Sequence, residues 1–494
     1  MQDLWRIGPT HVDLNITNGC NLACVHCHSS SGDKLENEMT TEQIIDTLDQ
    51  LHSMGVMHVA IAGGEPFIRR DIVDILGHAC HLPGWNVGVI TNGLFFRRNG
   101  FIEELKERCP GLRVNVSLDG STPEGFHILR RQPRRDNADP APMFQQICDG
   151  IEALVAAEMV VAVNMTLSAP TIQDCLPTYD LVVNKLGAAS LVGIKFFPGG
   201  YGKDLREVLD MPYAMWAREF VALTRAKIGG ELPGLQISVP AAWEFYLPLI
   251  EAGIDVSLAE KKWSYSAPLR QSVYASNYAL GDSAGIAEIA IAGDGTVYPS
   301  ILLVGLPEMV VGNVREQRVD EIWQASPILN GLRQAKLSNI SADCASCSMA
   351  SVCGGGSRTR ALSLSGDLLG ADAACPIIDA SLTASQTSRI DDRRTLASRG
   401  VARRTLGIGP SAVRAYLDQE GCQIRASGHV FSWDTDNGGH VFRIIDELNA
   451  PLGGAVGAVR PSEDADLIRR FVEKLLQLDD APPANMIKLL ELTN

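Results

Sequence analysis

Three closely spaced cysteines constrain this chain more than any other feature of its sequence. They are Cys20, Cys24 and Cys27, in a CxxxCxxC pattern. The alternating apolar run at 11–18 that precedes them is typical of a β-strand. A loop of this length can place three thiolates around one face of a 4Fe–4S cube, with a fourth ligand coming from elsewhere. If nothing in the protein supplies that ligand, one iron is left open to bind a small molecule.

Zinc is the alternative metal for this loop. A structural zinc ion needs four ligands in a tetrahedron, and His26 or His28 would then supply the fourth. The three cysteines alone leave both metals open.

Length and composition narrow the class of protein. The 494 residues suffice for two or three domains, no apolar run reaches the length of a membrane span, and the first residues lack the apolar core of a signal peptide. The formal net charge of −15 argues against nucleic acid as a partner, because phosphate binding depends on Lys and Arg. Twelve cysteines without an export signal suggest reduced thiols, and their clustering suggests metal binding. We therefore expect a cytoplasmic protein with no membrane and no nucleic-acid partner.

Strand-like and helix-like segments alternate through the first 200 residues. Thr40–Gln43 has the pattern of a capping box before an amphipathic helix. Six strands separated by helices predict parallel pairing with right-handed crossovers, hence an α/β sheet or partial barrel. In such sheets ligands bind at the carboxyl ends of the strands. The strands are expected at 11–18, 57–62, 86–90, 113–118, 160–167 and 191–197.

Two motifs on successive strand–helix turns together resemble the radical S-adenosylmethionine (SAM) superfamily. The first is the cysteine loop after the first strand, and the second is Gly63-Gly-Glu-Pro66 after the next strand. The resemblance implies a partial (β/α)6 barrel in which Cys20, Cys24 and Cys27 ligate a 4Fe–4S cluster whose open iron binds the amino and carboxylate groups of SAM. It further implies that Gly63–Glu65 receive the amino group, and that Thr91-Asn92 and Ser117 contact the ribose and the carboxylate.

The chemistry of these residues agrees with the implied contacts. Carbonyls and a carboxylate suit an ammonium group, whereas hydroxyls, amides and a cation suit a carboxylate. Arg130 is a candidate carboxylate partner, or else a solvated loop arginine beside Arg131, Arg134 and Arg135. His26 stands where the family commonly has an aromatic residue, and its imidazole can still pack on the adenine edge. The full set of expected SAM contacts is His26, Gly63, Gly64, Glu65, Pro66, Thr91, Asn92, Ser117, Asp119 and Arg130.

A second group of cysteines follows a predicted β-hairpin that turns at Gly293-Asp-Gly295. Four cysteines can close either an iron–sulfur cluster or a zinc site. The hairpin, Gly312-Asn-Val314 and the cysteine spacing together resemble the SPASM extension of radical SAM enzymes, which carries auxiliary 4Fe–4S clusters. The cysteines are Cys344, Cys347, Cys353 and Cys375.

The cysteine pattern departs from that of a full SPASM extension, which has seven cysteines. Ser300 and Ser357 stand where the pattern has cysteine, and the segment 281–285 contains none. The missing positions are those of the inner auxiliary cluster. We therefore expect one auxiliary cluster, and two 4Fe–4S clusters in the whole chain. Ile301, at a position that holds Asp in sulfatase-maturating enzymes, argues against that activity. The isolated cysteines, such as Cys80 and Cys109, are interpreted as small buried apolar residues.

The expected organisation ends with a C-terminal α+β domain. A hairpin at 423–433 and helices at 441–448 and 465–478 weakly resemble the peptide-recognition elements of peptide-modifying radical SAM enzymes, and an inert cap is the alternative. The expected segments are a radical SAM partial barrel at 1–230, a linking region at 231–285, a SPASM-like auxiliary-cluster domain at 286–380, a linker at 381–404 and the C-terminal domain at 405–494.

The predicted activity is the reductive cleavage of SAM to a 5′-deoxyadenosyl radical that takes hydrogen from a substrate. By analogy, the substrate is a ribosomally made precursor peptide, and flavodoxin or ferredoxin is the electron donor. An alternative is propionate decarboxylation in tetrapyrrole synthesis, because residues 24–32 and 366–369 resemble segments of those enzymes. A zinc-binding module without catalysis is the alternative from another class. The sequence identifies no general base and no site of hydrogen abstraction.

Overall fold

The computed structural model describes residues 9 and 11–378, with gaps at 55, 57, 83–84, 134–138, 266–279 and 348, and four strands between residues 404 and 433. The C-terminal helices predicted at 441–448 and 465–478 lie outside these residues. So does the predicted linker, apart from Arg404. None of the helices that the structure describes is long and apolar enough to cross a lipid bilayer.

A ten-stranded sheet forms the body of the molecule, in the order β10-β9-β8-β1-β2-β3-β4-β5-β6-β7. From β8 to β7 every neighbouring pair is parallel, and only β9 and β10 run antiparallel to their neighbours. The strands are β1 (His11–Asn15), β2 (His58–Ala62), β3 (Asn86–Thr91), β4 (Arg113–Ser117), β5 (Val160–Leu167), β6 (Ser190–Lys195), β7 (Leu235–Ser238), β8 (Glu288–Ile291), β9 (Thr296–Tyr298) and β10 (Gly312–Asn313). The expected α/β architecture with six strand–helix units is confirmed.

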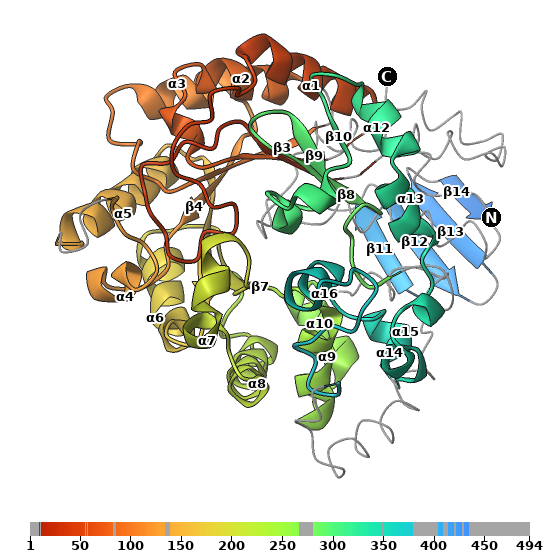
Figure 1. Cartoon of the computed structure of the whole chain (residues 1–494). Coiled ribbons are helices and arrows are strands. Elements are labelled where there is room, and N and C mark those ends of the chain that lie inside the picture. Colours follow the sequence, from red (N-terminus) through yellow and green to blue (C-terminus); the bar gives the residue numbers. More distant parts are fainter. Residues whose placement is uncertain are drawn as a thin grey trace.

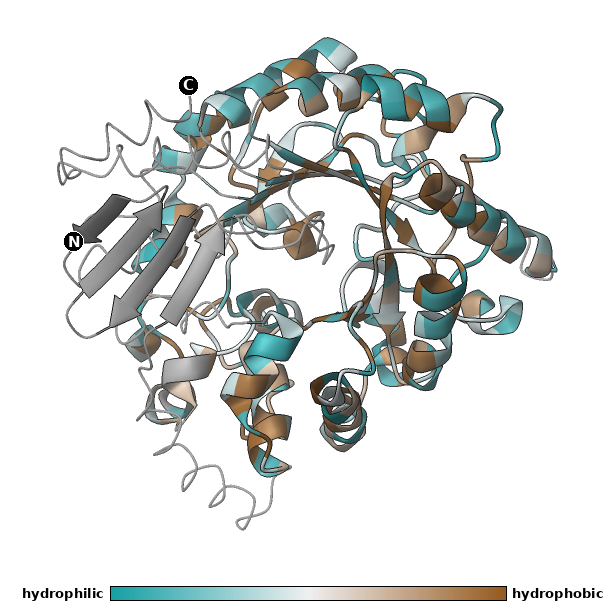
Figure 2. Cartoon of the chain, turned by 180° about the vertical axis from the view of Figure 1, so that it is seen from behind, coloured by the Kyte–Doolittle hydropathy of each residue, from teal (hydrophilic) through white to brown (hydrophobic). Residues whose placement is uncertain are grey.

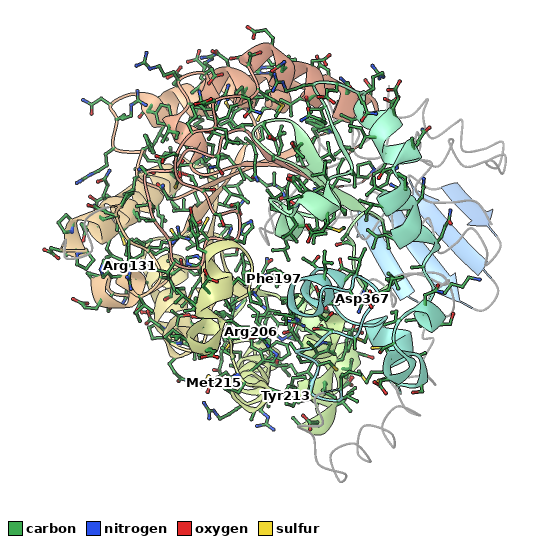
Figure 3. All side chains as sticks on the ribbon, in the orientation of Figure 1. Arg131, Phe197, Arg206, Tyr213, Met215 and Asp367 are labelled. Carbon is green, nitrogen blue, oxygen red and sulfur yellow. The ribbon has the colours of Figure 1, made fainter. Side chains whose placement is uncertain are left out.

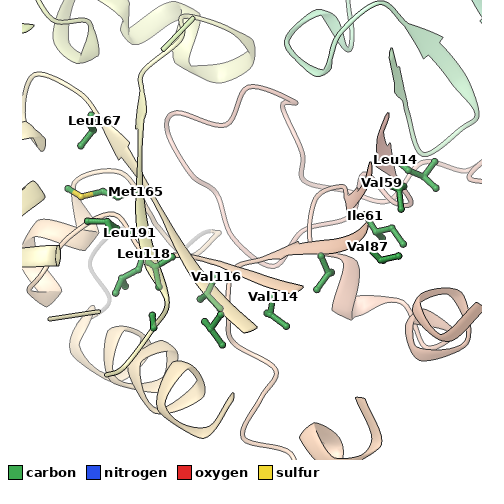
Figure 4. Close-up of a cluster of buried hydrophobic side chains, with 14 of the residues drawn as sticks. Leu14, Val59, Ile61, Val87, Val114, Val116, Leu118, Met165, Leu167 and Leu191 are labelled. Carbon is green, nitrogen blue, oxygen red and sulfur yellow. The ribbon is translucent and has the colours of Figure 1, made fainter. Parts of the chain in front are cut away.

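The two faces of the curved sheet differ in chemistry because successive side chains of a strand point to opposite faces. The outer face is a continuous apolar layer, whose labelled members in Figure 4 include Leu14, Ile61 and Val116. The inner face carries many small or polar residues, together with a few apolar ones such as Ile90 and Val192. For example, Asn115 is in register with Ala162, and Ser117 with Asn164. This contrast places the helices outside the sheet and a polar surface inside it.

Helices cover the outer, apolar face of the sheet (Figure 1), and their polar sides face away from it (Figure 2). Thr40 begins α1 with the predicted capping box, in which its hydroxyl accepts from the Gln43 amide. The helices are α1 (Thr41–Ser53), α2 (Ile72–His81), α3 (Phe101–Arg108), α4 (Pro123–His127), α5 (Ala141–Ala156), α6 (Cys175–Tyr179), α7 (Arg206–Leu209), α8 (Tyr213–Gly229), α9 (Ala242–Glu251), α10 (Val256–Trp263), α12 (Val319–Ala325), α13 (Pro327–Gln334), α14 (Ala342–Ser346), α15 (Ala350–Cys353) and α16 (Arg358–Ser365).

The predicted hairpin is part of the main sheet. β8 and β9 pair antiparallel as expected, and β8 also pairs in parallel with β1. At the other edge, β7 lies in the predicted linking region and continues the sheet beside β6. The segment that carries the second cysteine group is therefore attached to the first strand of the barrel.

A separate antiparallel sheet forms near the C-terminus, in the order β11-β12-β13-β14. The hairpin predicted at 423–433 corresponds to β13 and β14, in which Ala426 is in register with His429. The two strands before it were not predicted. The strands are β11 (Arg404–Ile408), β12 (Val413–Asp418), β13 (Gly421–Ala426) and β14 (His429–Trp433).

Candidate functional site

The first cysteine loop lies at the carboxyl end of β1, where the sequence placed it. Each of its three sulfurs is the acceptor of an N–H group: Cys20 Sγ from Leu22 N at 3.4 Å, Cys27 Sγ from Ser31 N at 3.5 Å, and Cys24 Sγ from Arg130 Nη1 at 3.7 Å. Hydrogen bonds of this kind to sulfur are a feature of iron–sulfur ligation. This donor set fits thiolates.

The pKa values of two of these thiols show what a bound cluster would have to change. Burial raises the pKa of Cys20 to about 11 and that of Cys24 to about 12. In the absence of a metal both groups are therefore neutral thiols at pH 7. A bound metal centre supplies the positive charge that deprotonates them.

The Gly63-Gly-Glu-Pro66 turn packs directly on the start of the cysteine loop. Gly64 N donates to Thr17 O and Glu65 N donates to Gly19 O, both at 2.8 Å. A Cβ atom on Gly63 would lie 2.4 Å from Thr17 O, and one on Gly64 would lie 2.1 Å from Gly19 O. Only glycine allows the two backbones to approach this closely.

We expect Gly64→Ala to displace the cysteine loop. The added methyl group meets backbone atoms that have no free space to move into, so we predict a loss of about 1–3 kcal/mol in the free energy of unfolding. We also expect a fall of at least about tenfold in SAM cleavage, because small misplacements at a reacting centre lower rates strongly. Gly331→Ala on α13 is the control, because its Cβ would meet nothing within 4 Å. Equal stability and turnover of the two variants would contradict the prediction.

Glu65 is buried and receives three hydrogen bonds. Its Oε1 accepts from the Thr91 hydroxyl at 2.9 Å and from Phe67 N at 3.0 Å, and its Oε2 accepts from Asn92 N at 2.7 Å. Burial raises the pKa of this carboxyl to about 7 despite these donors. In this structure the Thr91 hydroxyl therefore donates its hydrogen bond to Glu65. The predicted contact between Thr91 and SAM stays a prediction.

Asn92 links the same turn to the cysteine loop. Its Nδ2 donates to Asn21 Oδ1 at 2.7 Å, and its Oδ1 accepts from Leu94 N at 3.1 Å. Asn21 was not among the predicted site residues, although its place directly after Cys20 was a signal for a role in the loop.

Asp119, Arg130 and His26 form a buried group beside Cys24. Arg130 Nε donates to Asp119 Oδ2 at 2.5 Å, and His26 Nε2 lies 3.5 Å from the same oxygen. Thr166 N donates to Asp119 Oδ1 at 2.6 Å. The interpretation of Arg130 as a solvated loop arginine is wrong, because the side chain is buried and ion-paired.

Electrostatics keep Asp119 charged and His26 neutral. Burial alone would raise the pKa of Asp119, but the Arg130 guanidinium, His26 and the hydrogen bond from Thr166 N together outweigh it and hold that pKa below its ordinary value. Burial lowers the pKa of His26 to about 4. Among the described residues, His26 Nδ1 and Asn164 Oδ1 are buried polar atoms without hydrogen-bond partners. Such atoms at the carboxyl ends of parallel strands fit a polar ligand, because buried polar groups are normally paired.

The four cysteines of the second group line one cavity. Cys344 lies on α14, Cys353 ends α15, and Cys347 and Cys375 lie in the loops beside them. The rest of the lining is mainly apolar and includes Trp243, with Asp372 as the charged member. Burial raises the pKa of Cys375 to about 12, so this thiol also needs a metal centre to ionise at pH 7.

Within the described ranges, no three Cys, His, Asp or Glu side chains are grouped so that they could hold one metal ion. A 4Fe–4S cube places one thiolate on each iron and does not require several thiolates around a single ion.

The serines at the expected inner-cluster positions are both buried and take part in hydrogen bonds. Ser357 Oγ donates to Asp282 Oδ2 at 3.4 Å and also accepts from Arg360 N at 3.2 Å, which caps α16. Ser300 Oγ accepts from Leu302 N at 3.4 Å. This bonding fits the prediction of a single auxiliary cluster.

Two cysteines interpreted as isolated are partners. The thiols of Cys80, on α2, and Cys109, after α3, hydrogen-bond to each other. Cys109 is buried as expected, whereas Cys80 is half-buried, and the interpretation that the two are isolated is wrong.

A carboxyl group on β8 gives the protein a pH-dependent stability. Burial, with the nearby Asp13 as a further cause, raises the pKa of Glu288 to about 7 from an ordinary value of 4.5. The unfolded chain therefore loses this proton at lower pH than the folded chain does, and stability falls as pH rises from about 4.5 to 7.

We expect Glu288→Gln to remove this pH dependence. Between pH 5 and 7.5 the variant should gain about 1–2 kcal/mol relative to the wild type, a value reduced for the partial exposure of the side chain. The Ser283 hydroxyl, which donates to Glu288 Oε2 at 2.8 Å, still has an acceptor in Gln. Urea denaturation at the two pH values measures the change, and a constant difference between the two proteins would contradict it.

Comparisons with known proteins agree with the geometry. The model of the radical SAM superfamily matches residues 14–182, and that of an iron–sulfur cluster-binding SPASM domain matches residues 284–348. Among curated proteins, the AdoMet-dependent heme synthase of Methanosarcina barkeri is 26% identical over 74% of this chain and 96% of its own length. The mycofactocin maturase MftC of Mycobacterium ulcerans is 27% identical over 70% of this chain and 82% of its own length.

The fold is also that of a solved structure. Streptococcus suis SuiB bound to S-adenosylmethionine has a TM-score of 0.57 and 16% sequence identity, over 74% of this chain and 77% of SuiB. The paired motifs that follow β1 and β2 lie in the first matched segment. Cys344 and Cys347 lie in the second matched segment, and Cys353 and Cys375 follow it. The chain is therefore an enzyme with a radical SAM domain and an iron–sulfur cluster-binding SPASM domain, and the cofactors of these domains are SAM, a 4Fe–4S cluster and auxiliary iron–sulfur clusters.

Proposed function

We propose that this enzyme modifies a ribosomally made precursor peptide by radical chemistry started at the Cys20–Cys27 loop. The single observation that carries the choice of a peptide is the separate antiparallel sheet β11–β14. Its outer strands, β11 and β14, can pair with an extended peptide by strand addition. The likeness to SuiB, whose structure bound to precursor peptide SuiA is also known, supports the same choice.

The residues of the barrel have separate tasks in this proposal. Cys20, Cys24 and Cys27 hold the 4Fe–4S cluster, which supplies the electron that cleaves SAM when both are bound. Arg130 offers the carboxylate of SAM a cation fixed by Asp119. Glu65 fixes the turn beside it through Thr91 and Asn92.

The inner face of the sheet provides the surface for the substrate. Its small residues, such as Ala162, leave space, and Ser117 at the carboxyl end of β4 and Asn164 beside it on β5 offer hydrogen bonds. The helices and the apolar outer face keep water away from the back of the sheet. Cys344, Cys347, Cys353 and Cys375 hold one auxiliary cluster, and flavodoxin or ferredoxin is the proposed electron donor.

The experiment uses the purified, anaerobically reconstituted enzyme with SAM, a reductant and the short peptides encoded beside its gene. We expect one of these peptides to change mass and to increase the formation of 5′-deoxyadenosine. Two substitutions at neighbouring positions of β14, Val430→Pro and Phe431→Pro, test whether the peptide pairs with the edge of this sheet. One of two neighbouring amides points to β13 and the other to the open edge, so one variant should weaken peptide binding at least about tenfold while SAM cleavage continues.

A second candidate function is supported by the match to AdoMet-dependent heme synthase, which covers 96% of that protein. In that case a tetrapyrrole propionate would lose carbon dioxide. The same preparation incubated with an iron coproporphyrin, and followed by mass spectrometry, separates the two functions. Decarboxylation without modification of any peptide would overturn the peptide proposal.

A further inference from the structure

A chain of four buried charges joins the barrel to the second cysteine cavity. Lys195, the last residue of β6, donates to Glu244 Oε1 at 2.6 Å. Arg360 on α16 donates to the same oxygen at 3.0 Å and makes two bonds of 2.7 Å to the carboxylate of Asp372. The order is cation, anion, cation, anion, and each of the four residues is at most 4% exposed.

Asp372 is the member of this chain of charges that lies at the cysteine cavity. Its carboxylate lines the cavity of the four cysteines and also accepts from Trp243 Nε1 at 3.1 Å and from Ser357 N at 3.2 Å. Its backbone carbonyl accepts from Cys375 N at 2.9 Å. The side chain therefore lies beside the proposed auxiliary cluster, and the backbone of the same residue holds one of the proposed ligands.

Lys195, at the other end of the chain of charges, lines a large cleft. The cleft has a volume of about 1070 Å³ and lies between the α7–α8 segment and the loop at 373–376. Two of its lining residues, Arg206 and Tyr213, are labelled in Figure 3. Trp243 lines both this cleft and the cysteine cavity, so the two spaces are adjacent.

Burial makes this chain of charges effective over distance. Water and salt screen exposed charges strongly, but they screen charges inside a protein much less. The reduction potential of an iron–sulfur cluster depends on the net charge and the hydrogen bonds around it. A change of charge at Lys195 therefore acts on the cysteine cavity through Glu244, Arg360 and Asp372.

We propose that Asp372 is a positioning residue for the auxiliary cluster, and that the Lys195–Glu244–Arg360–Asp372 chain couples the potential of this cluster to the charge in the cleft. The inference rests on the proposed cluster site at Cys344, Cys347, Cys353 and Cys375. Its consequence is that a charged group entering the cleft changes the tendency of the cluster to accept an electron.

The test is a redox titration, followed by electron paramagnetic resonance, of the full chain with Cys20, Cys24 and Cys27 all replaced by Ala. This background retains only the auxiliary signal. Reduction adds a negative charge, so Asp372→Asn should raise the potential and Lys195→Met should lower it. Lys203→Met is the matched control, because Lys203 lines the same cleft but is exposed and lies outside the chain of charges. It should leave the potential unchanged.

Each outcome has a defined meaning. Potentials of K195M and K203M that both equal the parent value, at unchanged iron content, would overturn the inference. Loss of auxiliary iron from D372N but not from K195M supports a role of Asp372 in holding the ligand loop, and K195M then carries the measurement of the potential. A parent chain without auxiliary iron refutes the proposed cluster site instead, and it is recognised before any potential is compared.

Discussion

The Cys24→Ala variant is expected to form no 5′-deoxyadenosine from SAM and a reductant above background. Cys24 is the cysteine whose sulfur accepts from Arg130, so its loss removes a cluster ligand and a partner of the Asp119–Arg130 pair together. Two remaining thiolates cannot hold a site-differentiated cube, which takes three. Iron content should fall from about eight to about four atoms per chain, because the auxiliary cluster is bound elsewhere.

Cys148→Ala is the matched control for this substitution. Cys148 is a buried cysteine on α5 that packs in the hydrophobic core and belongs to neither cysteine group. Its replacement should leave iron content and turnover unchanged, with a modest loss of stability from the lost sulfur contacts. A Cys24→Ala protein that still binds about eight irons and cleaves SAM would show that the loop is not the cluster site.

Local sequence patterns predicted the barrel because its elements are specified locally. The Thr40 cap, the helix at 101–108 and the strand at 160–167 occur within one or two residues of their expected bounds. Each is defined by its own periodicity or cap and by its neighbours in the chain. The edge strand β7, at Leu235–Ser238, was also predicted from its strand-like sequence. The strands β11 and β12 carry weaker local signals and were not predicted.

The partners inside the site were not predictable in the same way. Asp119 and Arg130 are eleven residues apart in sequence, and a guanidinium in a stretch with three other arginines carries no sign of burial. Arg360 and Glu244 are separated by 116 positions, and only the packing of α16 against α9 brings them together. Motifs identify ligands because the spacing of ligands is local, whereas the charges around them are arranged by tertiary packing.

The second large effect expected is on stability, from Arg360→Met. Arg360 is 1% exposed and neutralises two carboxylates, those of Glu244 and Asp372. Removing one partner of a buried ion pair leaves a charge without compensation, which typically lowers the free energy of unfolding by about 3–5 kcal/mol. Glu244 keeps Lys195 as a partner, so most of the loss arises at Asp372, which retains only the Trp243 indole and backbone amides.

Arg318→Met gives the comparison for an exposed pair. Arg318 and Asp320 are 3.0 Å apart with more than a third of each side chain exposed, so their interaction is worth at most about 1 kcal/mol. Chemical denaturation of both variants, followed by circular dichroism at pH 7.5, should separate them by several kcal/mol. Equal losses would mean that the chain of charges from Lys195 to Asp372 is as well solvated as the surface. In that case the chain of charges could neither fix the loop that carries Cys375 nor transmit charge effects from the cleft to the auxiliary cluster.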